Sequence, residues 1–534
     1  MLSRNLPTIV LLFGAVTQTA AAEPPPIDEA LADRGLQALD AKDAALRRAV
    51  RRASPSIVAV YLRERAEFDQ PFFDRPDRRR QPRRMTFDDE TELQAAAMGA
   101  GIILDKSGKI LTCYHLVRAA VASGSKYDLN VRTQDGMLYS IGKEEILAGD
   151  PRSDLAVLRV TPTDQTNFTP ATFGDGGSLF VGQTVLALGN TFGVGIEDGA
   201  VSASVGMVGS VGRRAEPVFP ASVGAEQQFR ERRKHLLSWG PLVQVDCRLN
   251  LGTSGGALIN TRGEVVGITM ALAARTGMET PGGFVLPYDK LVRRIVDTLK
   301  AGREMEYGFL GVQPKNFTKA EARAMTGFPE VDGVLVQNVV LPQTMRGGLQ
   351  QGDVVIAIDG KPVRNSNDLV LQVGGCLAGQ TLKFKVVRRK GEFDLNVKLG
   401  KYPIAGPIIA TNGRRPFAGL KVDYLSLLVD KMSSNFFDLG STMPQGGVLV
   451  TEIEPSSPAD AQGISPESVI VSVDGKNVDS PDEFIRLAES AKGPVSLVVE
   501  TATSKAGLME WKRQTVELSP AKPKPKAAKD ADDH

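Results

Sequence analysis

Asn250-Leu251-Gly252-Thr253-Ser254-Gly255-Gly256-Ala257-Leu258 is the stretch that decides how the rest of the sequence is interpreted. Glycines on both sides of Ser254 permit a sharp turn, which leaves the side-chain oxygen exposed and turns nearby N–H groups outward. A serine hydroxyl becomes a nucleophile only when a base takes its proton, and the oxyanion of acyl transfer needs preorganised donors. The N–H groups of Gly252 and Ser254 are the candidate donors. The same pattern also fits a glycine-rich turn between two strands, so partner residues must decide between these interpretations.

The candidate base is a histidine, and the sequence has only three: His115, His235 and His534. His534 ends the chain and His235 lies in a charged segment, whereas His115 follows Ile110–Thr112, an apolar run typical of a strand. A rigid strand can hold an imidazole in place for general-base chemistry. A single histidine after a strand is also a common structural residue, so this position alone does not establish catalysis.

A buried carboxylate would complete the site by orienting the imidazole and stabilising its charged form. Asp154 stands directly before the apolar run Leu155–Val160, and Asp150 is the alternative. An aspartate before a strand is by itself usually a turn residue. The chain order His115, Asp154, Ser254 within a strand-rich region nevertheless matches one of the known orders of a catalytic triad. Together the three residues predict nucleophilic catalysis by Ser254.

Composition indicates a multidomain globular protein. The chain has 534 residues, 24% charged and 42% hydrophobic, which suits roughly three or four domains. Its formal net charge of +2 gives no argument for binding nucleic acid. The three cysteines, Cys113, Cys247 and Cys376, cannot all pair within one chain, so no disulfide framework is predicted.

The first residues are typical of an export signal. Arg4 supplies positive charge, Leu6–Val16 is mostly apolar, and the small residues Ala20-Ala21-Ala22 favour cleavage after Ala22. The apolar run is short for a membrane span, which needs about 20 residues; an uncleaved anchor is the alternative. We therefore expect a mature protein outside the cytoplasm, in the periplasm or cell envelope.

Short apolar runs separated by glycine or aspartate turns dominate the sequence from Met98 to Leu286. They predict strands of a closed or sandwiched antiparallel fold, and a double β-barrel fits. A helical pattern precedes them at Ile27–Arg52, and an amphipathic helix at Asp289–Ala301 closes the region. Two charged stretches, Arg63–Glu92 and Arg213–Trp239, are predicted to be loops; the second is either regulatory or a tolerated surface insertion.

The last third of the chain contains an internal repeat. Strand patterns around Asp359-Gly360 return around Asp474-Gly475, at an offset of 115 residues (475 − 360), each followed by a helical stretch and further strands. Gly400–Arg415 is predicted to be the linker between the copies. The predicted organisation is a signal peptide (1–22), a helical lead-in (23–53), a β-rich domain (54–303), two α+β modules (307–401 and 416–518) and a disordered tail (519–534).

Five motifs give this mostly β chain a resemblance to a known family. The motifs are Thr112-Cys113-Tyr114-His115-Leu116-Val117, Asp150-Pro151-Arg152-Ser153-Asp154-Leu155-Ala156, Leu188-Gly189-Asn190-Thr191-Phe192-Gly193, Gly252-Thr253-Ser254-Gly255-Gly256-Ala257-Leu258 and Val266-Gly267-Ile268. In this order they resemble the HtrA (Deg) family of trypsin-like serine proteases. The resemblance implies a trypsin-like double β-barrel followed by two PDZ-like domains. It also implies an ATP-independent endopeptidase of the cell envelope that cleaves misfolded or unfolded proteins and assembles into trimers or larger homo-oligomers.

The resemblance also assigns binding residues. Ile268, Thr269 and Met270 would border the substrate pocket, which favours a modest apolar residue before the cut. Carboxylate-binding loops of the PDZ-like domains, which would take C-terminal peptides, correspond to Phe309-Leu310-Gly311-Val312 and Phe417-Ala418-Gly419-Leu420. The second of these loops is less typical, so we expect peptide binding chiefly in the first domain.

Four positions near the site depart from the family pattern. Asparagine is usual where this chain has Cys113 and Thr253, and small residues are usual at Cys247 and Arg248. Arg248 borders the predicted pocket: pointing inward it would alter or block the pocket, and pointing outward it would be a solvated charge.

Two other functions compete with proteolysis. A catalytically weak chaperone or peptide-binding scaffold would use the same fold and its PDZ-like domains. An esterase would share the nucleophile chemistry, but the strand-rich context lacks the strand-turn-helix setting of a nucleophile elbow. No cofactor is expected, because the sequence has no phosphate-binding loop and no cluster with metal-ligand spacing.

Overall fold

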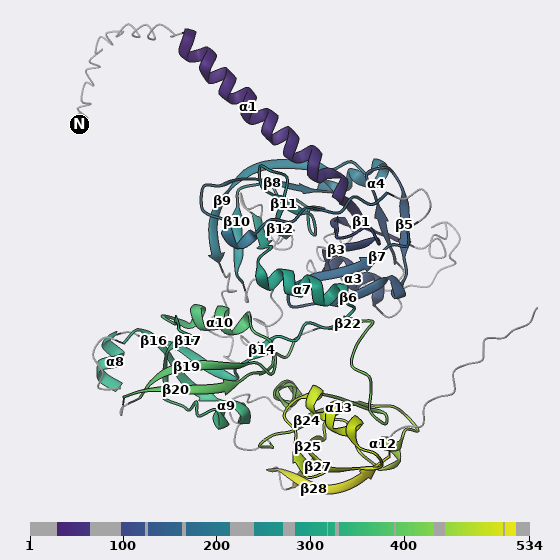
Figure 1. The fold of residues 1–534 in the computed structure, drawn as a ribbon, viewed down its shortest axis with the longest axis vertical. Helices are drawn as coiled ribbons and strands as arrows, with labels where there is room; N and C mark the ends of the chain where they lie inside the picture. Colours follow the sequence, from purple (N-terminus) through teal and green to yellow (C-terminus); the bar gives the residue numbers. More distant parts are fainter. Residues whose placement is uncertain are drawn as a thin grey trace, which may run out of the picture. The chain divides into compact units, whose positions relative to one another are not determined.

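A computed structural model describes residues 29–64, 98–122, 127–162, 167–213, 240–270, 283–317, 319–325, 331–388, 391–404, 406–431, 444–505 and 508–519. The predicted signal peptide, most of both charged loops and nearly all of the C-terminal tail lie outside these residues. The chain forms two units, residues 1–47 and 48–534, and each is described by itself. The fold is mostly β, as predicted (Figure 1).

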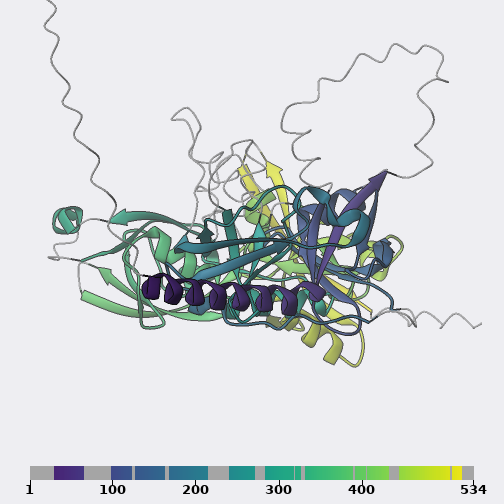
Figure 2. The same ribbon diagram turned by 90° about the horizontal axis from the view of Figure 1, so that it is seen from above.

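Helix α1 (Glu29–Ala53) is the predicted lead-in, and it is continuous over 25 residues (Figure 2). In its first part, Leu36 and Leu39 are exposed. Its last turn, which belongs to the second unit, is anchored: Ala49 and Ala53 are buried, and Arg52 donates a hydrogen bond to the carbonyl of Arg262. Among the described helices, none has both the length and the apolar character that a membrane crossing needs.

The first sheet of the β-rich domain has eight strands in the order β22-β6-β7-β3-β2-β1-β4-β5. Their bounds are β1 Ile57–Glu64, β2 Met98–Ile103, β3 Lys109–Cys113, β4 Tyr127–Arg132, β5 Leu138–Ile141, β6 Ile146–Asp150, β7 Leu155–Arg159 and β22 Ile409–Ala410. The sequence did not predict β4, β5 and β6: polar residues interrupt the apolar pattern of β4 and β5, and β6 is a short run that ends at Asp150. Helix α3 (Tyr114–Val121) follows β3 directly.

The second half of this domain is a closed barrel in the order β10-β13-β12-β11-β8-β9. Its strands are β8 Thr184–Gly189, β9 Ser202–Arg213, β10 Leu242–Val245, β11 Ala257–Ile259, β12 Val265–Met270 and β13 Gly283–Pro287, and the short helix α4 (Gly195–Asp198) lies between β8 and β9. Each of the six strands coincides with an apolar run of the sequence, although the ends of some strands are shifted. Of the predicted two barrels, only this one closes within the described residues.

Helix α7 (Lys290–Lys300) ends the domain, as the amphipathic pattern predicts. The side chain of Asp289 caps it by accepting the N–H of Val292. Val292, Ile295, Val296 and Leu299 are all 2% exposed or less. The helix therefore buries its apolar face and continues directly into the repeated modules.

The first module has the strand order β15-β16-β17-β19-β20, with β18 paired to β17. Its elements are β14 Gly308–Phe309, β15 Val312–Phe317, α8 Lys319–Met325, β16 Gly333–Val339, α9 Pro342–Arg346, β17 Val354–Ile358, β18 Lys361–Pro362, α10 Ser366–Gly374, β19 Thr381–Arg388, β20 Gly391–Lys398 and β21 Gly400–Lys401.

The second module repeats this order as β23-β24-β25-β27-β28, with β26 paired to β25. Its elements are β23 Leu420–Tyr424, α11 Leu428–Lys431, β24 Val448–Ile453, α12 Pro458–Ala461, β25 Val469–Val473, β26 Lys476–Asn477, α13 Pro481–Ser490, β27 Val495–Lys505 and β28 Leu508–Leu518. In both modules the first long strand lies at an edge of the sheet.

The predicted repeat holds at the level of single hydrogen bonds. Asp359-Gly360 and Asp474-Gly475 both have two consecutive positive φ angles, the conformation of a tight hairpin turn. Asp359 accepts the N–H of Lys383 at 2.8 Å, and Asp474 accepts the N–H of Ser496 at the same distance. The Asp-Gly dipeptide therefore marks the same type of hairpin turn in both modules.

The predicted linker, Gly400–Arg415, is more ordered than the sequence suggested. Gly400–Lys401 forms β21 and pairs with β14, and Ile409–Ala410 forms β22 and pairs with β6 of the first sheet. Strands of two residues carry too little pattern to be recognised in a sequence. The segment after the first module thus extends a sheet of the β-rich domain.

Candidate active site

His115 and Asp154 form the centre of the site. The Nδ1 atom of His115 lies 2.6 Å from Oδ2 of Asp154, and the backbone N–H of His115 donates to Oδ1 at 2.9 Å. Both residues are buried, with 9% and 5% of their surface exposed. One carboxylate therefore fixes both the ring and the backbone of the histidine. With the proton on Nδ1 facing the carboxylate, Nε2 is the basic nitrogen.

Two local features hold this pair. His115 follows β3, as predicted, and lies in the first turn of α3, so a helix sets the position of its Cα atom. Asp154 has a φ of 55°, which is unusual for a residue other than glycine, and its carbonyl accepts the N–H of Tyr114 at 2.8 Å. Strained backbone of this kind persists only where its surroundings fix it.

Asp150, the alternative carboxylate, has a different task. It accepts hydrogen bonds from the N–H groups of Arg152 and Ser153, both at 3.1 Å, and from the hydroxyl of Ser153 at 2.5 Å. Tyr307, which lies between α7 and the first module, donates its hydroxyl to the same carboxylate. Asp150 thus closes the turn that presents Asp154, and of the two carboxylates Asp154 is the one hydrogen-bonded to His115.

The electrostatics of this turn follow from burial. Burial raises the pKa of Asp150 above its usual range, against the opposing effect of its hydrogen bonds. Burial and the charge of Asp150 raise the pKa of Tyr307 well above its ordinary value, so its hydroxyl stays protonated and remains a donor. The guanidinium of Arg152 lies 4.3 Å from the ring centre of Tyr307 and 4.0 Å from that of Tyr402.

Ser254 lies on a turn that only glycine can shape. Gly252 and Gly255 have φ angles of 90° and 82°. A Cβ atom at Gly252 would collide with the carbonyl oxygen of Asn190, and one at Gly255 with that of Ala100. The predicted need for flanking glycines is therefore steric as well as conformational.

Hydrogen bonds place the serine turn beside the histidine. The carbonyl of Ser254 accepts the N–H of Ala100 in β2 at 2.8 Å. An added Cβ atom at Gly255 would lie 3.1 Å from the backbone nitrogen of Cys113, two residues before His115. The closed barrel thus brings Ser254 to the end of the sheet that carries His115 and Asp154. Gly252, the other predicted oxyanion donor, lies in the same turn.

The predicted pocket residues separate into two groups. Ile268, Thr269 and Met270 lie on β12 with at most 1% of their surface exposed. Thr269 supports the serine turn: its hydroxyl donates to the carbonyl of Thr253 at 2.6 Å, a role that the sequence did not reveal. The side chain of Arg248 is exposed, which corresponds to the outward alternative. The backbone N–H of Arg248 donates to the hydroxyl of Ser204.

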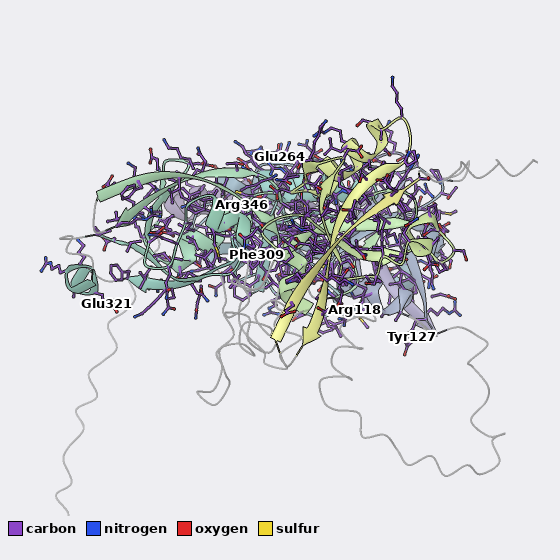
Figure 3. All side chains as sticks on the ribbon, turned by 90° about the horizontal axis from the view of Figure 1, so that it is seen from below. Arg118, Tyr127, Glu264, Phe309, Glu321 and Arg346 are labelled. Atoms are coloured by element: carbon purple, nitrogen blue, oxygen red, sulfur yellow. The ribbon has the colours of Figure 1, made fainter. Side chains whose placement is uncertain are left out.

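The two predicted carboxylate-binding loops have equivalent positions. Phe309 (labelled in Figure 3) and Leu310 are buried and precede β15, as Phe417 and Ala418 precede β23. Leu420, the first residue of β23, is fully buried, whereas Val312 at the start of β15 is half-buried. Gly311 and Gly419 both have positive φ angles, of 66° and 88°. Each loop therefore turns sharply into an edge strand.

Comparison with known proteins gives the same order of domains. A trypsin-like peptidase domain family matches residues 99–268, and PDZ domain families match residues 308–399 and 449–501. A probable periplasmic serine endoprotease DegP-like of Pseudomonas fulva (strain 12-X) is 31% identical over 401 residues, 74% of each chain. A protein of the same description from Rhizobium meliloti (strain 1021) is 30% identical over 442 residues, 81% of this chain and 77% of that one. A solved structure, HtrA-type protease AlgW with decapeptide, is 26% identical with a TM-score of 0.49, over 68% of this chain and 99% of that chain.

A peptidase domain of trypsin type followed by two PDZ domains defines a serine endopeptidase, and this is the class of the present chain. The similarity to the two bacterial relatives covers 74% and 81% of this chain and about three quarters of each relative. The chain belongs to the HtrA family of DegP-like serine endoproteases, as its motifs predicted.

Proposed function

We propose that this protein cleaves unfolded or misfolded proteins in the periplasm, without ATP, through an acyl-enzyme formed on Ser254. The observation that carries the proposal is the 2.6 Å hydrogen bond between His115 and Asp154, with the turn of Ser254 held against the same sheet end. A buried carboxylate on Nδ1 leaves Nε2 as the base that a serine nucleophile needs.

In the proposed mechanism His115 removes the proton of Ser254 as the oxygen attacks the scissile carbonyl. The carboxylate of Asp154 stabilises the imidazolium that forms, and the N–H groups of Gly252 and Ser254 bind the oxyanion. His115 then gives its proton to the leaving amine. Water, activated by the same histidine, releases the second product and restores Ser254. By family resemblance Ile268, Thr269 and Met270 of β12 border the substrate pocket, so an apolar residue before the cut is favoured.

The PDZ domains would bind C-terminal segments of the same substrates. β15 and β23 lie at the edges of their sheets, where a peptide can add a strand and its carboxylate can meet the backbone N–H groups of the preceding loop. Pro314 in β15 has no N–H to donate, whereas β23 contains no proline. The edge strands thus give the first domain no advantage. The expected preference for the first domain rests on its more typical carboxylate-binding loop.

The periplasmic location rests on the predicted export signal and on the relatives, which are described as periplasmic. Assembly into trimers or larger homo-oligomers rests on family membership alone. Sedimentation of the purified mature chain tests the assembly, and fractionation of cells tests the location.

The decisive experiment follows degradation of a reduced, unfolded protein by the purified mature chain without nucleotide or added metal. Ser254→Ala should abolish cleavage, and Ser490→Ala, an exposed serine on α13, should leave it intact. If the parent chain does not cleave but prevents aggregation of the unfolded protein, the chaperone alternative replaces the protease.

A matched pair of glycines tests the PDZ assignment. An alanine Cβ atom would collide with Leu341 at Gly311 and with Ser457 at Gly419, so the two substitutions disturb the two loops in the same way. In the Ser254→Ala background, Gly311→Ala should weaken binding of a labelled C-terminal peptide about tenfold and Gly419→Ala less, and amidating the peptide should mimic the larger loss. The reverse order in a fluorescence titration would assign peptide binding to the second domain.

A further inference from the structure

Side chains that could bind a metal ion lie around the proposed triad. The thiol of Cys113, a ring nitrogen of His115 and a carboxylate oxygen of Asp154 all lie within 4.8 Å of one another. The thioether sulfur of Met270 lies 3.6 Å from the sulfur of Cys113. These residues come from the end of β3, the start of α3, the turn before β7 and the end of β12. Their separation in sequence hides a cluster that spacing alone does not predict.

The dimensions and donor types suit a thiophilic cation. Zinc binds sulfur, nitrogen and oxygen ligands at about 2.0–2.3 Å, so neighbouring ligand atoms in a tetrahedral site are about 3.3–3.8 Å apart. The distance between the two sulfur atoms falls in this range, and the other two atoms, from His115 and Asp154, need only small shifts. Thiolate, imidazole and carboxylate are the three common protein ligands of zinc, and softer cations would also accept the thioether.

We propose that Cys113, His115 and Asp154 form an inhibitory site for a thiophilic metal cation of the zinc type, with Met270 beside it. Binding releases the thiol proton of Cys113 to solvent and requires no redox change. The 10% of the His115 side chain that is exposed marks the side from which the ion arrives. This inference rests on the proposed function, because the metal would silence the same histidine.

Inhibition follows whichever ring nitrogen the metal takes. At Nε2 the metal occupies the lone pair that would accept the proton of Ser254. At Nδ1 it displaces the proton shared with Asp154, widens their 2.6 Å separation and removes the hydrogen bond that orients the ring. In both cases His115 stops acting as a general base.

Cys113 is one of the positions where this chain departs from the family pattern. Family resemblance leads one to expect asparagine there, and an asparagine amide offers no thiolate. The other two cysteines serve as controls: Cys247 lies in the core of the closed barrel, where burial raises the pKa of its thiol to about 11, and Cys376 lies two residues after the end of α10. Both lie outside the cluster at the triad.

A spectroscopic measurement tests metal binding without relying on proteolysis. Cobalt(II) added to the reduced, metal-free Ser254→Ala protein should give a thiolate-to-cobalt charge-transfer band that Zn²⁺ displaces. Cys113→Ser and Cys113→Asn, in the same background, should lose the band, and Cys247→Ser and Cys376→Ser should keep it. A band that survives both changes at Cys113, or no band in the parent, overturns the proposal.

An activity measurement tests the inhibition. Zn²⁺ should lower the rate of the parent protease at least tenfold, and a chelator should restore it. Each variant is compared with its own metal-free rate, and Cys113→Ser should need at least tenfold more Zn²⁺ for the same loss. Equal sensitivity of parent and Cys113→Ser would contradict a role for the thiol. If the parent lacks protease activity, the proposed function fails while the cobalt band still decides whether the metal site exists.

Discussion

The two sides of the candidate active site are supported by different parts of the molecule. On the serine side, the supporting contacts come from the protease domain itself, through Ala100, Asn190 and Thr269. On the aspartate side, Tyr307 bonds to Asp150 from beyond helix α7. The proposed nucleophile is thus held by contacts within the protease domain, whereas the carboxylate proposed to orient the base depends on segments that connect the domains.

Further contacts join the aspartate side to the segments that connect the domains. Tyr114, next to His115, donates its hydroxyl to the carbonyl of Pro407 at 2.6 Å, and β22 pairs with β6. Arg152 packs between Tyr307 and Tyr402, which flank the first PDZ domain. A change in the position of the segments that connect the domains would therefore affect the turn of Asp154 more directly than the turn of Ser254.

The largest expected effect is at the aspartate itself. Asp154→Asn should lower kcat about ten-thousandfold, because an amide stabilises neither the correct tautomer nor the imidazolium. The substitution is nearly isosteric, so circular dichroism and melting should stay close to those of the parent. Cleavage of an unfolded protein at saturating substrate measures the effect. A loss of less than tenfold would mean that Asp154 is not the orienting carboxylate.

On the serine side, Gly252→Ala should lower kcat about 10²–10³-fold. The added Cβ atom would collide with the carbonyl of Asn190, and the φ of 90° disfavours alanine, so the turn must move and with it one proposed oxyanion donor. Thr253→Ser, a neighbouring change that adds no atoms, is the control. Single-turnover acylation by an active-site ester reports the loss, and a normal acylation rate would remove Gly252 from the oxyanion site.

Tyr307→Phe should have a smaller effect, about tenfold in kcat with KM unchanged, because it removes one hydrogen bond to Asp150 and leaves the ring that packs on Arg152. The hydroxyl opposes the rise in the pKa of Asp150, so its loss should shift the acidic limb of the pH–rate profile to higher pH. Thr269→Val, which removes one hydroxyl from the support of the serine side, should leave that limb in place. An unchanged profile in Tyr307→Phe would confine Tyr307 to packing.

Local patterns explain what the sequence predicted well. The strands, α7, the Asp-Gly turns and the glycines around Ser254 each depend on neighbours in the chain, so their residue types indicate their structure. The choice of His115, which the structure pairs with Asp154, was possible because the chain offers only three histidines. Helix α3 was not predicted: an eight-residue helix beginning directly after a strand has no separate signal.

Contacts between distant segments explain what the sequence did not predict. Asp150 and Tyr307 are 157 residues apart, and so are Cys113 and Met270. Neither pair leaves a periodic pattern or a spacing that could be recognised. The segment Gly400–Arg415 looked like a plain linker for the same reason, because its strands bond to partners elsewhere. The predicted pair His115–Asp154 was therefore found, whereas the supporting contacts from distant segments, Thr269 on the serine side and Tyr307 on the aspartate side, were not predicted.

Lys401, at the end of the first PDZ domain, is the strongest candidate for holding together the segments that connect the domains. It is 2% exposed, and its ammonium lies 2.6 Å from Glu304, 2.7 Å from Asp423 and 3.6 Å from Glu306. Glu304 and Glu306 precede the first PDZ domain, and Asp423 belongs to β23 of the second. Burial lowers the pKa of Lys401, but the three carboxylates outweigh it and raise the pKa above its usual value.

Lys401→Met should therefore affect stability more than catalysis. Leaving buried carboxylates without their cation should destabilise the fold by about 3 kcal/mol at pH 8, near the lower end for such losses because Glu304 and Asp423 stay partly exposed. A raised lysine pKa contributes stability in full below the unfolded value of about 10.4, and this contribution is lost as the pH rises toward the folded value. The difference between parent and variant in denaturant midpoint should accordingly shrink between pH 8 and pH 11.5. If that difference stays constant across this range, the charge of Lys401 does not hold together the segments that connect the domains, and the aspartate side depends on packing alone.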